Sequence, residues 1–195
     1  MRPKFLFALV LVTCCSVGLA AAGYLWTLNH PPSDKAAGRW DPLLVKVSEY
    51  KKWTLVNPVP DLMEPAAAID CVRVPGREIG SPHLNKYISV YVNETGRAAM
   101  MSQLRPQFPT GSMIVKEKLS SKTSTTPELL TAMVKRDAGY NPESGDWEYM
   151  VLNDTAETIT ERGKLTSCQT CHHLYQKSDF VTRTYLPREV LDKLK

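Results

Sequence analysis

The pattern Cys168-Gln169-Thr170-Cys171-His172 constrains this chain more than any other feature of its sequence. C-x-x-C-H is the attachment motif of c-type haem: two thiols form thioethers with the vinyl groups of one porphyrin, and the adjacent histidine binds the iron. The motif lies near the C-terminal Lys195, and no methionine follows it. A small electron-transfer cytochrome carries its motif early and an axial methionine downstream, so this chain cannot be built in that way.

Two other interpretations of the motif are weaker. A C-x-x-C redox pair would not need His172. Half of a zinc site would need further ligands, and the remaining Cys71, His83 and His173 form no second paired motif. We therefore predict one covalently attached haem c, held by the two cysteines of the motif, with His172 as the iron ligand.

A helical bundle, the other class with a late haem motif, conflicts with the rest of the chain. The sequence contains 14 prolines spread along its length, and interior prolines break long helices. Strict alternation over Tyr87–Val92 is typical of a strand. We expect an α+β fold: a mainly antiparallel β sheet with short flanking helices and the haem motif at its C-terminal end. The expected strands are 87–92, 112–119, 129–136 and 147–153, with a further one near 71–74, and the expected helices are 42–53 and 95–104.

The N-terminus resembles an export signal. Arg2 and Lys4 precede an uncharged, mostly apolar stretch to Leu28, which contains the small residues Ala20–Ala22. Residues 1–28 are therefore either a cleaved signal peptide or a retained anchor in the membrane. A linker, 29–40, separates them from the predicted haem domain, 41–195. We expect a periplasmic protein, soluble or tethered by its N-terminal anchor, and its formal charge of +4 gives no sign of nucleic-acid binding.

Several segments, in this order, resemble the cytochrome P-460 family, which includes the related cytochromes c-prime-beta. The resemblance spans roughly residues 53–187. It rests on 90–93, 108–117, 132–135, 145–149 and the haem segment through 181. It implies a periplasmic, mainly antiparallel β protein, usually a homodimer, with one five-coordinate haem open to a small ligand. Some members oxidise hydroxylamine and have a lysine bonded to the haem edge, whereas the c-prime-beta proteins lack that bond and bind nitric oxide.

The resemblance points to two residues as candidates for catalysis. Lys116 matches the cross-linking lysine of the family, although a solvent-facing lysine on a strand is the alternative. Alternation places Lys116 on the side of Ile114 but does not decide which side faces the haem. Thr131 stands where hydroxylamine-oxidising members have a distal glutamate. A threonine hydroxyl hydrogen-bonds a ligand but takes no proton near neutral pH, which disfavours hydroxylamine oxidation.

Three further residues are candidates for haem contacts. Phe108 is the better candidate for an aromatic cap over the haem, with core packing as its alternative. Met133 shares a strand face with Thr131 and would border the distal pocket of the haem. Its alternative role is packing in the core. Arg183, together with Lys177, would pair with the haem propionates, unless both lie on a solvated surface.

Three classes of function remain open. The chain is an oxidoreductase acting on hydroxylamine or nitrogen oxides, a nitric oxide-binding or scavenging protein, or an electron-transfer cytochrome. The expected partners are a small nitrogen-oxide ligand or hydroxylamine, an electron-transfer partner protein and a second copy of the chain. Once the two cysteines of the motif are assigned to haem and the leader is removed, Cys71 remains. It is either a buried free thiol or part of a disulfide across a dimer.

Overall fold

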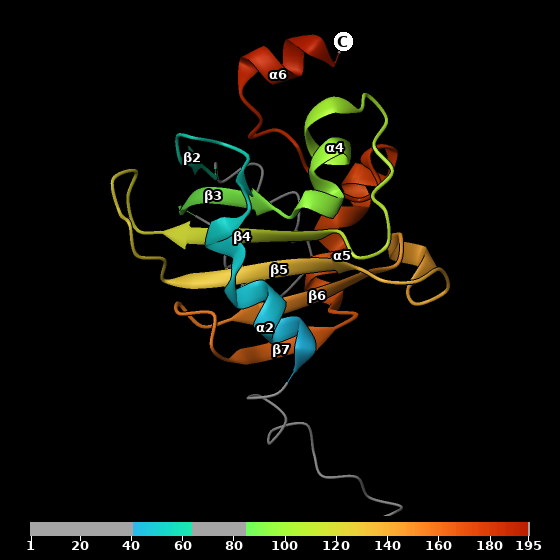
Figure 1. Ribbon diagram of the computed structural model, residues 1–195, viewed down its shortest axis with the longest axis horizontal. Coiled ribbons are helices and arrows are strands. Elements are labelled where there is room, and N and C mark those ends of the chain that lie inside the picture. The colour runs from blue at the N-terminus through green and yellow to red at the C-terminus, as the bar shows by residue number, and fades with distance from the viewer. Residues whose placement is uncertain (1–40, 64–84, 195) are drawn as a thin grey trace, which may run out of the picture. The chain divides into compact units, whose positions relative to one another are not determined.

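The computed structural model describes residues 41–63 and 85–194, which form a sheet of seven strands flanked by short helices (Figure 1). The strands are β1 (Thr54–Leu55), β2 (Asp61–Leu62), β3 (Tyr87–Val92), β4 (Met113–Leu119), β5 (Leu129–Lys135), β6 (Trp147–Leu152) and β7 (Ile159–Gly163). The α-helices are α2 (Pro42–Ser48), α4 (Glu94–Ser102), α5 (Thr166–His172) and α6 (Arg188–Lys193). The 3-10 helices are η2 (Tyr50–Lys52), η3 (Pro142–Ser144) and η4 (His173–Ser178). The expected α+β fold is confirmed. The predicted leader 1–28, the linker 29–40, Cys71 and His83 lie outside the described residues.

The order of the strands brings distant residues together. The strands run β1-β3-β4-β5-β6-β7, with β2 also paired to β3, and every pairing is antiparallel. In this register Val90, Lys116, Thr131 and Val151 lie side by side across β3 to β6. Lys116 and Thr131, the two residues that the family resemblance singled out, are therefore direct neighbours in the sheet.

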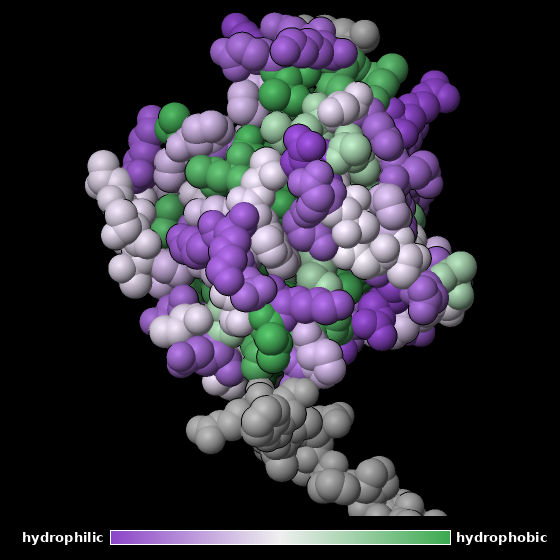
Figure 2. All heavy atoms as spheres, in the orientation of Figure 1, coloured by the Kyte–Doolittle hydropathy of each residue, from purple (hydrophilic) through white to green (hydrophobic). Residues whose placement is uncertain are grey.

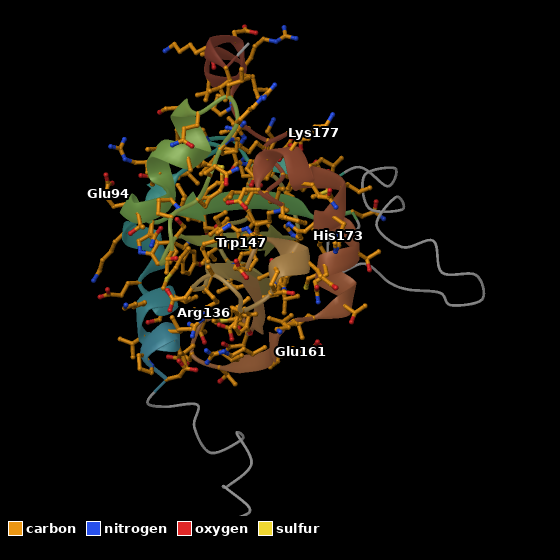
Figure 3. The ribbon with its side chains drawn as sticks, turned by 90° about the vertical axis from the view of Figure 1, so that its right-hand side faces the viewer. Glu94, Arg136, Trp147, Glu161, His173 and Lys177 are labelled. Carbon is orange, nitrogen blue, oxygen red and sulfur yellow. The ribbon has the colours of Figure 1, made fainter. Side chains whose placement is uncertain are left out.

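The two faces of the sheet carry separate apolar clusters, as alternating side chains require. Ile114, Met133 and Trp147 belong to one cluster, which also contacts Cys168 of α5. Met113 and Val115 belong to the other, which packs under α2. Figure 3 shows α2 on one side of the sheet and the α5–η4 segment on the other. The haem motif therefore lies over the face that includes Ile114.

Helix α2 begins where the sequence predicts it. The Asp41 side chain accepts a hydrogen bond from the backbone of Leu43 at 2.8 Å, and Pro42 occupies the first turn. The α-helix ends at Ser48 rather than continuing to 53, and the chain tightens into η2. The tighter turn brings Tyr50 to β4, where its hydroxyl donates to Glu117 at 2.6 Å.

The surface on the α2 side is mostly hydrophilic, with scattered hydrophobic side chains (Figure 2). Among residues 41–63 and 85–194, no helix is both long and apolar enough to span a bilayer.

Candidate functional site: a C-x-x-C-H helix on a sheet

Helix α5 presents the motif on one side. Residues three and four apart in a helix are neighbours on its surface, so Cys168, Cys171 and His172 share a face. Both cysteines are partly buried, and Cys168 packs against the apolar cluster that contains Trp147. Burial raises the pKa of the Cys168 thiol above its ordinary value. This is the spacing that two thioether bonds and an axial histidine require.

His172 is held in the form that binds a metal. Its Nδ1 lies 2.6 Å from the carbonyl oxygen of Phe180. A carbonyl only accepts hydrogen bonds, so Nδ1 carries the proton and Nε2 keeps its lone pair. Burial, followed by the positive charge of Lys116, lowers the pKa of His172 to about 3. The imidazole is therefore neutral, with Nε2 available to iron.

The turn that presents the Phe180 carbonyl is fixed by the sheet. Asp179 and Phe180 both have left-handed backbones, with φ of 54° and 62°. The Asp179 carbonyl accepts from Trp147 Nε1 at 2.8 Å, and its carboxylate accepts from the backbone of Phe108 at 2.8 Å. Lys135 Nζ donates to both carboxylate oxygens at 2.7 Å. β5 and β6 thus determine where His172 points.

Two neighbours complete the surroundings of this turn. Gly145 has φ of +62°, and a Cβ there would lie 2.6 Å from the Phe180 ring, so only glycine fits. The Tyr149 ring packs against His172, with ring centroids 5.3 Å apart. His173, the next residue along the chain, turns to Phe180 at 5.5 Å. In Figure 3 His173 lies where α5 meets η4.

The sheet face beneath α5 carries two lysines and a threonine. Lys116 is 7% exposed, and its Nζ lies 5.3 Å from the centroid of the Tyr185 ring. Lys118, two residues further along β4, is 0% exposed and donates to Thr131 Oγ1 at 2.9 Å. Both lysine charges act on the pKa of His172. Lys116, Lys118 and Thr131 therefore belong to the same site as the motif.

Phe108 and Met133 lie in the core on this face. Phe108 is 3% exposed and packs edge to face on Trp147 at 5.4 Å. Met133 is 6% exposed and pairs with Tyr149 in the sheet register. Core packing, the alternative for both residues, is what the structure shows. Their contact with haem stays a prediction.

Arg183 has a structural role as a helix cap. Its guanidinium reaches the C-terminal end of α4, where helix carbonyls lack partners. The four acceptors are the carbonyl oxygens of Ala99, Met100, Gln103 and Leu104. A contact of Arg183 with a haem propionate stays a prediction.

Four residues of the site were missed by sequence reasoning. Strand alternation places Lys118 on the same face as Lys116 and would have revealed it. Lys135, Asp179 and Tyr149 lie in segments that carry the family resemblance, but their place beside the motif results from tertiary packing, which no local pattern predicts.

The donor set fits haem: two thiols and a neutral imidazole share one helix face, and that face packs on the sheet. The hydroxyl of Tyr185, buried beside Lys116, has no hydrogen-bond partner among the described residues, as is expected where a bound group contributes to the site. Such a fold and site define a haem-iron protein. A family model described as Cytochrome P460 matches residues 48–183. The chain belongs to the cytochrome P460 family, whose cofactor is haem. A search of curated proteins found no match.

Proposed function

We propose that the protein is an exported c-type cytochrome with one covalently attached haem, whose iron has a position open to a small nitrogen-oxide ligand or hydroxylamine. The bond between His172 Nδ1 and the Phe180 carbonyl carries this proposal, because it leaves Nε2 for iron. When bound, haem supplies an iron that coordinates a small ligand and exchanges an electron.

The residues of the site have distinct roles in this proposal. Cys168 and Cys171 hold the porphyrin, and His172 binds the iron on one side. Thr131 Oγ1 accepts from Lys118, which leaves the threonine's own proton to be donated to a ligand. A threonine is no general base at neutral pH. This favours a second candidate function, reversible nitric oxide binding without turnover.

The leader pattern of residues 1–28 supports a periplasmic location, either soluble or tethered by an N-terminal anchor. The family resemblance supports a homodimer and an electron-transfer partner protein. Either function uses the electron-transfer partner: turnover needs an electron acceptor, and a nitric oxide-binding protein needs a reductant to keep its iron ferrous.

Spectroscopy of the protein expressed with haem maturation factors tests the proposal. We expect haem to remain attached after denaturation, and the Cys168→Ala and Cys171→Ala variants each to lose one thioether in the pyridine haemochrome spectrum. We also expect a five-coordinate high-spin spectrum that shifts when carbon monoxide or nitric oxide is added. A six-coordinate low-spin haem that binds neither gas would instead assign the protein to electron transfer.

Lys116→Leu separates the enzyme from the binding protein. Because Lys116 Nζ lies over the Tyr185 ring, we expect the variant to keep the wild-type Soret band and haem mass. A broad, red-shifted ferrous Soret band that disappears in the variant would show a lysine-modified haem. Hydroxylamine turnover with an electron acceptor would then be the expected activity, and its absence alongside tight nitric oxide binding would support the second candidate.

A further inference from the structure

Lys118 is an unusual residue to find inside this protein. Its side chain is 0% exposed, although burying an ammonium group without a partner is costly. Among the described residues, the amine makes one hydrogen bond, to Thr131 Oγ1 at 2.9 Å. An ammonium has three protons to donate. The other N–H donors of Lys118 therefore have no acceptor among the described residues.

Three charged pairs of the described chain show what a structural ion looks like here. Lys135 has both oxygens of Asp179 at 2.7 Å. Glu117, on the opposite face, has Lys51, and Glu148 has Arg162 at 2.6 Å. Within residues 41–63 and 85–194, no carboxylate forms such an ion pair with Lys118. Lys118 is therefore not explained as half of a structural ion pair.

The described groups that lie around Lys118 are polar or basic side chains rather than carboxylates. Lys116 comes from the same strand, Thr131 from β5, and Cys168 and His172 from α5. Burial, and then the charge of Lys116, holds the pKa of Lys118 well below its ordinary value. A negatively charged ligand atom beside the amine would raise the pKa of Lys118 again, against both its burial and the charge of Lys116.

We propose that Lys118 and Thr131 together are the hydrogen-bond donors of the ligand site, and that they select ligands whose outer atom carries negative charge. The inference rests on the proposed function, since it requires an open iron position. Lys118 donates to Thr131, and Thr131 is thereby turned to donate its own proton. The pair thus offers donors rather than a proton acceptor, which suits anions such as nitrite or azide better than hydroxylamine, a substrate that must lose protons.

Ligand binding to the holoprotein tests this inference, with azide as the probe of the ferric form and carbon monoxide as the neutral probe of the ferrous form. We expect Lys118→Met to weaken azide binding about tenfold or more, as the loss of a hydrogen bond to a charged group does. The carbon monoxide stretching frequency should rise, because an N–H donor to the ligand is removed. Thr131→Val should change both in the same direction. The exposed Lys122→Met, which removes the same charge outside the site, should change neither.

The outcomes separate this inference from the proposed function. If the wild type binds neither azide nor carbon monoxide, the open position itself is refuted. If it binds both, and Lys118→Met and Thr131→Val leave azide affinity and the stretching frequency unchanged, Lys118 and Thr131 do not contact the ligand. A pairing of Lys118 with a haem propionate would produce that second result. A merely structural lysine would change the melting temperature but not the stretching frequency.

Discussion

Lys135 and Asp179, 44 residues apart in the chain, form a partly buried ion pair in which Lys135 Nζ lies 2.7 Å from each carboxylate oxygen. The pair joins β5 to the turn whose next residue, Phe180, accepts the hydrogen bond of His172. The ion pair therefore helps to position His172, the proposed iron ligand, as well as contributing to stability.

Asp179→Asn tests this positioning role. It leaves the partly buried Lys135 amine without its counterion, and we expect a loss of roughly 3 kcal/mol in the free energy of unfolding. We also expect a lower iron–histidine stretching frequency, because a displaced Phe180 carbonyl accepts less strongly from His172. Glu49→Gln, in the exposed Glu49–Lys52 pair, is the control and should change neither quantity measurably. An unchanged frequency would limit Asp179 to a structural role.

Gly145→Ala tests the packing behind the same turn. The new methyl would lie 2.6 Å from the Phe180 ring, whereas at Gly139, which also has positive φ, nothing lies within 4 Å. Both variants carry the cost of a left-handed alanine, so their difference isolates the clash. We expect Gly145→Ala to cost about 1–3 kcal/mol more than Gly139→Ala in urea unfolding. Equal losses would mean that the Phe180 ring moves aside freely.

Arg183→Ala tests whether this arginine serves α4 or the haem. Four carbonyl oxygens lose a charged donor, and we expect about 2 kcal/mol lower stability. The haem reduction potential should stay at its wild-type value. Arg97→Ala, which breaks the exposed pair with Glu94 on the same helix, should be nearly neutral. A clear change in potential for Arg183→Ala would support a propionate contact.

The stability of the protein should depend on pH through Lys118. Its pKa is lowered in the folded state, so above that value the unfolded chain binds one more proton than the folded chain. Stability therefore rises with pH until the ordinary lysine pKa of about 10.4 is reached. Lys118→Met removes this dependence and should be the more stable protein at neutral pH. Urea unfolding should show that the difference in free energy of unfolding between Lys118→Met and the wild type narrows as the pH rises from about 7 to about 10. A constant difference would contradict a depressed pKa.

Much of the fold was predictable because its central strands alternate clearly. β3, expected at 87–92, has those bounds, and β4 to β6 differ from their expected ranges by one residue at an end. β7 was missed: Ile159–Gly163 is short, polar and mostly exposed at the sheet edge, so it has no buried face to give a period-two signal. α2 was predicted too long because a tertiary contact, Tyr50 with Glu117, tightens its end.

The site was predictable only where a motif or a resemblance names it. The C-x-x-C-H spacing predicts a haem-binding role for Cys168, Cys171 and His172. That role stays a prediction, and the structure places all three residues on α5. The neighbourhood of Lys116 and Thr131 depended on the register between β4 and β5, which alternation alone does not give. The Lys135–Asp179 pair depends on how the chain returns to the sheet after α5. No pattern in the sequence around either residue predicts this contact.

The dependence of His172 on the Lys135–Asp179 pair has an evolutionary consequence. A buried charge that loses its partner is costly, so neither residue is free to drift alone while the other remains. The two positions should change together among descendants of this chain, or not at all. Gln169 and Thr170, between the two cysteines of the motif, carry no charge that could pair with Lys135. The identity of the proposed iron ligand is thus inherited through the motif, but the orientation of its side chain is inherited through the sheet.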